Sequence, residues 1–423
     1  MSRIIVDLRN ELNIIVNGVK KIRIEEDACF KTLEKEGKFL SYPKDIQWSY
    51  YRAILILREK AINIGKSLSD NEIKRILDDF LIDLLYNNTD ERMKTVEREI
   101  KQLFATIKSI GTEKHLFIMP INYITISGSM QIGDSQFFTL DETSLIEVKN
   151  QYSLDFSTIL SDTRKKTEDM NRTNETSTYT LVIVEANDDD KAEELAILKT
   201  ERCLNVLRLF YIDSPFTIRD EKIDHFVRDI IHVNLTTQSC SGSVRAINLD
   251  TLIGAPHIDV DIIQRMEKDG LTTISQLLSK DEDDLTPLEK DILTAIFWFG
   301  SAMKERQRDM KFVKLMTAIE TILIPDGGTT KQHRLAARFA SIIYNSDTPE
   351  ERKKVYHIMK NLYQLRSSIL HSGKGYVYEE DMGQAVAWSQ RLILQLLKDI
   401  REQLSLSKLL EKKYPIDEKL VCV

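Results

Sequence analysis

The sequence feature that most constrains the fold is a helix-start pattern that occurs twice in the last third of the chain. Thr286-Pro-Leu-Glu289 and Thr348-Pro-Glu-Glu351 each place a threonine before a proline, with a glutamate three residues after the threonine. The threonine caps free amides of the first helical turn, the proline fits the first helical position, and the glutamate bonds back to the threonine. Apolar residues recur at intervals of three and four after both starts, which predicts amphipathic helices.

A bundle of five helices is the expected fold of residues 285–408. Pro325-Asp-Gly-Gly is expected to end the second helix, because proline removes a backbone donor and glycine favours a helix stop. Gly373 is expected to end the fourth helix in the same way. A fifth helix is predicted over about 379–406, and residues 409–423 are expected to be a loose, charged tail.

Two further regions precede the bundle, since 423 residues exceed what one core usually holds. Residues 1–112 are expected to be mainly helical, and residues 113–284 to mix strands and helices. In the second region, residues 179–186 have the composition of a strand and residues 191–210 that of a helix. The predicted fold class is therefore mostly α with an α+β middle region, which is a candidate sensor.

The overall charge argues against a protein that coats nucleic acid nonspecifically. The formal net charge is −7, and the isoelectric point is near 5.7. A local cluster of Arg, Lys and His can still focus positive potential on an acidic protein. A site that binds RNA is therefore compatible with this composition.

No targeting segment, membrane span or metal site is predicted. Charged residues interrupt the apolar residues near Met1, and no apolar stretch approaches the ~18 residues of a membrane span. The four cysteines form no CxxC pair. His225 and His232 lie seven residues apart on an expected helix, without a Cys or carboxylate pair around them. We therefore expect a cytoplasmic protein with reduced thiols, no metal and no cofactor.

The best clue to chemistry is Tyr363-Gln-Leu-Arg366-Ser-Ser-Ile-Leu-His371-Ser-Gly373, near the end of the fourth expected helix. The guanidinium of an arginine can neutralise a phosphate through a planar fork of donors. The imidazole of a histidine can transfer a proton near neutral pH. Arg366 and His371 therefore supply the two functions needed to cleave RNA without a metal.

The spacing alone is weak evidence, because short motifs often occur by chance. Arg219 precedes His225 by six residues, and Arg352 precedes His357 by five in the same expected helix as the candidate pair. Arg352 and His357 lie in the first half of that helix, far from its stop. We expect both pairs to have ordinary structural roles.

Helix geometry separates Arg366 from His371 on one chain. Five residues rotate a helix by about 140° and advance it by about 7.5 Å, so the two side chains do not share a face. A symmetric dimer could bring the arginine and the histidine of two chains together. His371 also lies in the last helical turn, where the helix dipole favours the imidazolium form.

Three segments, in this order along the chain, carry a resemblance to a known family: Leu315-Met-Thr-Ala-Ile-Glu320, Arg334-Leu-Ala-Ala-Arg338 and Tyr363 through Gly373. With these segments on successive helices, residues 286–406 resemble the HEPN domains, in particular the Apea-like HEPN group of bacterial and archaeal defence proteins. The resemblance covers a little under a third of the chain. It implies a helical bundle that dimerises so that the Arg and His of two protomers line one cleft.

The resemblance also implies an activity, since many HEPN proteins are metal-independent endoribonucleases. By this analogy, Arg366 would bind and neutralise the scissile phosphate. His371 would move protons to or from the ribose 2′-hydroxyl and the leaving oxygen. Many active members carry Asn, Asp or His directly after the arginine, whereas this chain has Ser367.

Two more residues are candidates for supporting roles. Glu320 is expected to pair with Arg334 or Arg338 inside the bundle, with support of Arg366 as the alternative. Tyr363 is expected to fill a dimer interface, with stacking on an RNA base as the alternative.

The resemblance thus implies an endoribonuclease that acts in anti-phage defence by abortive infection. RNA, with tRNA as one candidate, would be the substrate, a second copy of the chain would be the partner, and the N-terminal region would bind a phage-derived trigger. The alternative is a non-catalytic HEPN protein: an RNA-binding protein, or an adaptor or assembly subunit of a defence or toxin–antitoxin system. No membrane partner is expected.

Overall fold

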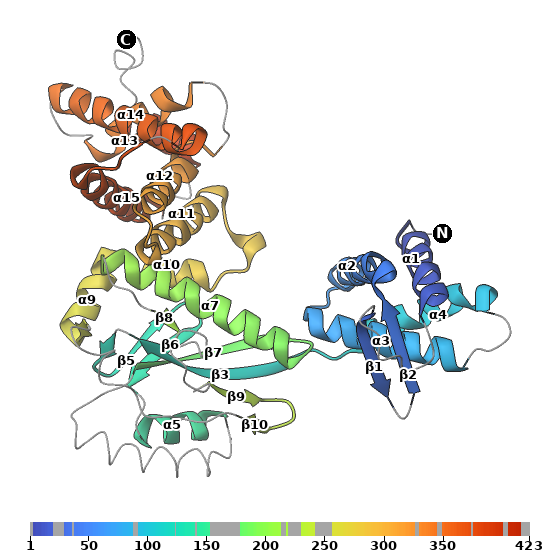
Figure 1. Ribbon diagram of the computed structural model, residues 1–423. Coiled ribbons are helices and arrows are strands. Elements are labelled where there is room, and N and C mark those ends of the chain that lie inside the picture. Colours follow the sequence, from blue (N-terminus) through green and yellow to red (C-terminus); the bar gives the residue numbers. More distant parts are fainter. Residues whose placement is uncertain are drawn as a thin grey trace. The chain divides into compact units, whose positions relative to one another are not determined.

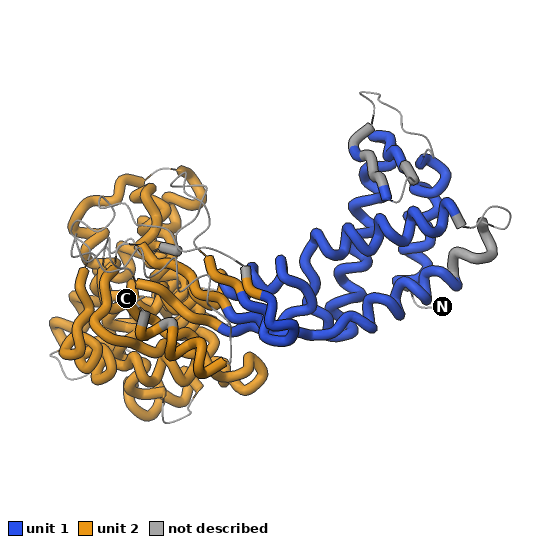
Figure 2. Tube along the Cα trace, turned by 90° about the horizontal axis from the view of Figure 1, so that it is seen from below, with its two compact units in different colours: residues 1–116, 183–196, 233–239 blue, residues 117–182, 197–232, 240–423 orange. Residues whose placement is uncertain are grey.

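The computed structural model describes residues 3–19, 29–35, 38–87, 92–122, 124–139, 142–152, 178–212, 217–218, 230–241, 256–325, 330–344, 349–373, 375–400 and 405–415. The chain divides into two compact units (Figure 2). The first unit comprises residues 1–116, 183–196 and 233–239, and the second comprises residues 117–182, 197–232 and 240–423.

Four helices and a β-hairpin form most of the first unit: α1 (Arg3–Gly18), β1 (Cys29–Lys35), β2 (Lys38–Pro43), α2 (Gln47–Asn63), α3 (Asp70–Asn87) and α4 (Arg92–Ser109). Leu12, Leu57 and Leu77 belong to its buried core. The hydroxyl of Ser69 accepts a hydrogen bond from the Glu72 amide at 3.0 Å and so caps the start of α3. The hairpin lies in a region that was expected to be helical.

The described residues in the middle of the chain form nine strands: β3 (Glu113–Asn122), β4 (Thr125–Ile126), β5 (Ser129–Ile132), β6 (Ser135–Thr139), β7 (Thr178–Ala186), β8 (Thr217–Ile218), β9 (Ile231–Asn234), β10 (Ser239–Ser241) and β11 (His257–Ile258). Seven form one sheet in the order β10-β9-β3-β7-β6-β5, with β8 paired to β3, while β11 pairs with β4. The antiparallel β5–β6 pair turns at Gly133, whose φ is +54°.

Among the described residues of this region, these strands are accompanied by α5 (Glu142–Tyr152) and α7 (Asp189–Phe210). Leu204 and Leu207 of α7 join Phe137 of β6 in one buried cluster, so α7 packs on the sheet. The strand and the helix predicted at 179–186 and 191–210 are both present.

The C-terminal part is a helical bundle (Figure 1). Its helices are α9 (Val260–Asp269), α10 (Leu271–Leu278), α11 (Pro287–Lys304), α12 (Arg308–Leu323), α13 (Lys331–Ile343), α14 (Pro349–Ser372), α15 (Glu379–Asp399) and α16 (Leu406–Lys412). At the start of α11, Thr286 and Glu289 make both hydrogen bonds of a capping box, as predicted. Gly373 adopts a φ of +60° at the end of α14, which confirms the predicted stop.

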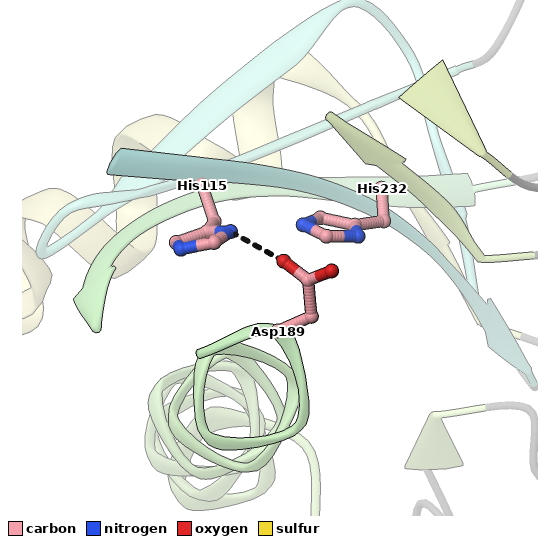
Figure 3. A group of neighbouring side chains, drawn as sticks. All are labelled: His115, Asp189 and His232. Atoms are coloured by element: carbon pink, nitrogen blue, oxygen red, sulfur yellow. Dashed lines mark ion pairs between the residues drawn. The ribbon is translucent and has the colours of Figure 1, made fainter. Parts of the chain in front are cut away.

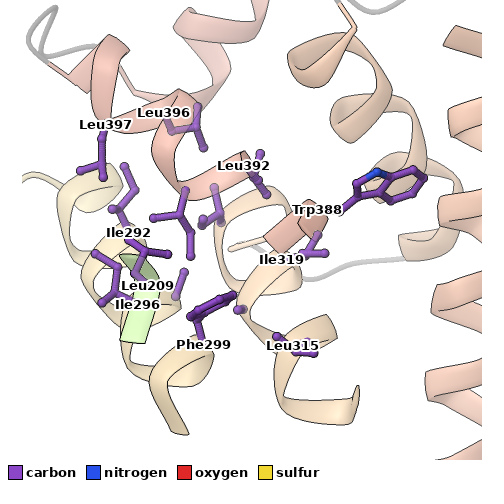
Figure 4. Packing of buried hydrophobic residues seen from close by; sticks show 14 of the residues in the cluster. Leu209, Ile292, Ile296, Phe299, Leu315, Ile319, Trp388, Leu392, Leu396 and Leu397 are labelled. Carbon is purple, nitrogen blue, oxygen red and sulfur yellow. The ribbon is translucent and has the colours of Figure 1, made fainter. Parts of the chain in front are cut away.

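One continuous hydrophobic core joins the bundle to α7 (Figure 4). Phe299 of α11, Leu315 of α12 and Leu392 of α15 are fully buried in it, and Leu209 of α7 belongs to the same cluster. The core continues into α16, where Leu409 and Tyr414 are buried. The beginning of the expected loose tail is therefore packed against the bundle.

The close approach of α7 and α11 depends on Gly300. A Cβ atom at this position would lie 2.2 Å from the side-chain oxygen of Asn205, so alanine does not fit without movement. We expect Gly300→Ala to lower the free energy of unfolding by about 1–3 kcal/mol, measured by urea denaturation, because overpacking strains the core. Gly383→Ala is the matched control: nothing lies within 4 Å of its Cβ position in α15. That control should be neutral or stabilise the protein by up to ~1 kcal/mol.

Partial burial on α11 gives Asp291 an unusual titration. Burial raises the pKa of its carboxyl to about 6, whereas an unfolded chain has an Asp pKa of about 3.9. At pH values between these two pKa values, the folded state binds more protons than the unfolded state. The free energy of unfolding should therefore fall as pH rises from 4 to 7. Asp291→Asn should remove this part of the pH dependence and stabilise the protein at pH 7 relative to the unchanged chain. Urea denaturation at pH 4 and pH 7 measures the free energy of unfolding of both proteins. An equal change between the two pH values in the variant and in the unchanged chain would contradict the prediction.

These elements confirm the predicted fold class, mostly α with an α+β middle region and a C-terminal helical bundle. In the described ranges, every helix is too short or too polar to span a bilayer.

Candidate functional site

The predicted site residues lie on or beside α14, which packs against α13. The amide of Gln332 donates to the Lys360 carbonyl at 2.8 Å, and the Nδ1 atom of His333 lies 2.6 Å from the Tyr356 hydroxyl oxygen. Leu362, in the C-terminal half of α14, is buried. These contacts fix the helix that carries Arg366 and His371.

Arg366 is held by an ion pair with Glu320 of α12. The distance from its Nη2 atom to a carboxylate oxygen is 3.0 Å, and both side chains are less than a fifth exposed. The carbon of the guanidinium group lies 5.8 Å from the centre of the Tyr363 ring, within the range of a cation–π contact. The Nε atom is buried and has no hydrogen-bond partner among the described residues. The guanidinium is thus oriented by the bundle rather than free in solvent.

Glu320 contacts Arg366, which was the alternative to its expected pairing with Arg334 or Arg338. Its carboxylate contacts Arg366, accepts a hydrogen bond from the Tyr363 hydroxyl at 3.4 Å, and lies 3.7 Å from the Lys331 ammonium. Arg338 instead donates to the carbonyl of Leu323, at the end of α12. The expected packing pair of Glu320 with Arg334 or Arg338 is therefore wrong, because the carboxylate meets Arg366 of α14, a helix that α12 contacts as well as α13.

Tyr363 and Ser367 flank the arginine on α14. Tyr363 is half-buried and packs against the hydrophobic core. Burial, followed by the neighbouring Glu320 charge, raises the pKa of its hydroxyl, so the group remains a hydrogen-bond donor at neutral pH. Ser367 is also half-buried.

His371 is exposed in the last turn of α14. In the described parts of the chain, no hydrogen bond, ion pair or ring contact joins it to Arg366. This agrees with the rotation of about 140° that five helical residues produce. A single chain therefore orients the arginine and exposes the histidine without bringing the two together.

The other Arg–His pair on this helix has structural contacts. The Nε atom of Arg352 donates to the carbonyl of Tyr344, which follows the end of α13, at 3.2 Å. His357 is exposed, and its ring meets the Tyr356 ring edge-on at 5.3 Å. These contacts agree with the ordinary role expected for the pair. Arg219 and His225 lie outside the described residues.

A second group of titratable side chains was not anticipated from the sequence. Figure 3 shows His115, Asp189 and His232. The Nδ1 atom of His115 lies 3.5 Å from the Asp189 carboxylate, while the His232 ring stacks on Phe117 at 4.5 Å. Each imidazole thus has a contact of its own, and we assign both histidines structural roles. His232 lies in β9, so the helix expected around it is wrong there.

Basic residues gather on the two helices that border the site. α13 carries three Lys or Arg residues and no acidic one. α14 carries five Lys or Arg residues and two acidic ones. This local excess contrasts with the net charge of −7 for the whole chain.

No protein-family model, curated protein or solved structure matches the chain.

Proposed function

We propose that this chain is a metal-independent endoribonuclease of the HEPN type that acts as a homodimer in anti-phage defence. Its substrate is RNA, with tRNA as one candidate, and the region before the bundle senses a phage-derived trigger. Cleavage of cellular RNA would then halt growth, which is abortive infection.

The observation that carries this proposal is the basic pair α13 and α14 on an otherwise acidic chain. A local excess of positive charge attracts the phosphates of RNA even when the net charge is negative. Arg366 lies on this pair of helices in a fixed orientation, and His371 is exposed at its end. Two of the three segments that resemble HEPN domains, residues 334–338 and 363–373, fall on or beside the same helices, and the third, residues 315–320, lies on α12.

The chemistry requires only these side chains and the RNA itself. The 2′-hydroxyl oxygen attacks the adjacent phosphorus and loses its proton to a base, while the 5′-oxygen of the next nucleotide leaves and gains a proton. His371 takes the proton from the 2′-hydroxyl and returns it to the leaving 5′-oxygen, and the guanidinium of Arg366 neutralises charge that develops on the phosphate. The products are a 2′,3′-cyclic phosphate end and a 5′-hydroxyl end.

The dimer follows from the separation of the two groups on one helix. In a two-fold arrangement, Arg366 of one chain can face His371 of the other across the same phosphate. The exposed position of His371 leaves it accessible to such a partner.

The second candidate is a non-catalytic HEPN protein that binds RNA or serves as an adaptor or assembly subunit. The ion pair between Arg366 and Glu320 favours it, because the carboxylate already compensates the charge that a phosphate would meet. In this case RNA would bind without being cut.

Incubation of the purified chain with RNA in excess EDTA separates the two candidates. The ribonuclease should produce fragments with 2′,3′-cyclic phosphate and 5′-hydroxyl ends, either as the purified protein alone or after a lysate from phage-infected cells is added as the trigger. Intact RNA that nevertheless co-migrates with the protein under every condition would support the non-catalytic candidate.

A further inference from the structure

A cavity of about 400 Å³ lies between α7, the end of α10 with the following residues, and the first half of α11. Most of its walls are apolar and include Leu198, Leu277, Leu285, Leu293 and Phe297. Leu198 and Phe297 are nearly half exposed, so the cavity is open to solvent. Its size and its composition are those of small-molecule sites in proteins.

A buried asparagine in the lining of this cavity has an unused donor. Asn205 of α7 lines the cavity and is only 3% exposed. Its side-chain oxygen accepts a hydrogen bond from Nη1 of Arg208 at 2.6 Å, which fixes the orientation of the amide. Its Nδ2 atom has no hydrogen-bond partner among the described residues. A ligand acceptor in the cavity would give this donor a partner.

Glu201, one helical turn earlier, offers an acceptor beside this donor. Its Oε1 atom accepts from the same Nη1 atom of Arg208 at 2.7 Å and from the Lys304 ammonium at 3.0 Å. Its Oε2 atom makes no hydrogen bond within the described parts of the chain. Because Asn205 and Glu201 bind the same Nη1 atom of Arg208, the two side chains lie next to each other in the cavity wall.

Positive charge borders the same cavity. Arg202 and Lys290 line it, and neither forms an ion pair with another described residue. Lys280 also lines it but is bound to Glu289 at 2.7 Å. Glu282 is the acidic residue of the lining that no described cation neutralises. Arg202 and Lys290 therefore remain available for an anionic group.

We propose that this cavity binds a nucleotide. The edge of a nucleobase presents an acceptor beside a donor, which matches the Asn205 amide and the Glu201 carboxylate. The flat ring would lie against Phe297 and the leucine side chains. The phosphates would meet Arg202 and Lys290.

A purely hydrocarbon ligand fits these observations less well. It would fill the apolar walls but make no hydrogen bond with the Asn205 donor or the Glu201 acceptor. An inorganic phosphate compound would satisfy Arg202 and Lys290 but leave the apolar walls empty. The nucleotide is the class that uses all three features, and this assignment is independent of the proposed ribonuclease activity.

Isothermal titration calorimetry of the full-length chain tests the proposal with ATP, GTP, CTP and UTP as probes. Inorganic triphosphate and dodecanoate are titrated in parallel. We expect at least one nucleotide to bind with one site per chain and neither of the other probes to bind. Leu198→Trp, at an exposed position, should block the cavity and abolish binding.

Three further variants locate the contacts. Arg202→Ala and Lys290→Ala should each weaken nucleotide binding by roughly tenfold, the loss expected for a charge-assisted hydrogen bond. Asn205→Leu should weaken it at least as much, and thermal unfolding checks that the variant still folds. Lys398→Ala, on an exposed position of α15, is the control and should bind as the unchanged chain does.

Failure of all four nucleotides to bind overturns the proposal. So does equal binding of inorganic triphosphate, binding of dodecanoate alone, or nucleotide binding that survives Leu198→Trp. Because calorimetry measures binding without RNA cleavage, none of these results depends on whether the chain is a ribonuclease.

Discussion

Replacement of Arg366 or of His371 by alanine is expected to reduce RNA cleavage in EDTA by roughly a thousandfold or more. Arg366 supplies the guanidinium that is held toward α12 by Glu320, and His371 supplies the exposed imidazole. Loss of either removes one of the two groups on which the proposed chemistry depends. A fluorescence assay with a single-stranded RNA that carries a dye and a quencher measures the rate.

The other Arg–His pair of α14 provides the matched control. Arg352→Ala and His357→Ala remove the same two residue types at the same spacing from the first half of the same helix. Both should leave the cleavage rate within about threefold of the unchanged chain, because these positions are mainly structural. Arg366→Lys should stay nearly as inactive as Arg366→Ala, since an ammonium cannot reproduce the planar fork. Full activity in either Arg366→Ala or His371→Ala would remove the catalytic assignment.

Phe299→Ala should lower the free energy of unfolding by about 3–5 kcal/mol, the usual effect of removing a buried aromatic ring. Phe299 is fully buried between α11, α12 and α15 and belongs to the core that also contains Leu209 of α7 (Figure 4). The loss combines the transfer of the ring into water with the cavity that remains. Urea denaturation followed by circular dichroism measures it.

Phe297 is the control for this substitution, because it lies two residues away on α11 and is nearly half exposed. Phe297→Ala should change the free energy of unfolding by less than about 1 kcal/mol. Equal losses of unfolding free energy for the two variants would show that α11 does not bury the face that carries Phe299.

The C-terminal bundle could be predicted because its helices carry local signals. The Thr286 capping box and the Gly373 stop act within a few residues, so the sequence near each helix end determines where the helix begins and ends. The strand β7 was predictable for a related reason, since its long apolar run is typical of a buried strand.

Elements with short or weak patterns could not be predicted. The hairpin of β1 and β2 has charged residues among few apolar ones, so neither helical nor strand periodicity stands out. Likewise, α16 is short and rich in lysine, and its place in the structure depends on tertiary burial of Leu409 and Tyr414. His232 lies in a strand of four residues, too short to be distinguished from a helix by pattern.

The same limit applies to the candidate site. Sequence spacing identified Arg366 and His371, but the partner of Glu320 depends on how α12 packs against α14. Likewise, Asn205 and Glu201 reach the cavity beside α11 only through the packing of α7, which no local pattern records. Contacts between helices distant in the sequence therefore had to come from the structure.

The claim on which the proposed function rests is that Arg366 of one chain and His371 of a second chain act on one phosphate. Mixing inactive Arg366→Ala protein with inactive His371→Ala protein tests this directly, with RNA cleavage in EDTA as the measurement. In a mixed dimer, one of the two sites regains an intact arginine and an intact histidine, so substantial cleavage should return. A mixture that forms dimers but remains as inactive as its two components would contradict the shared site.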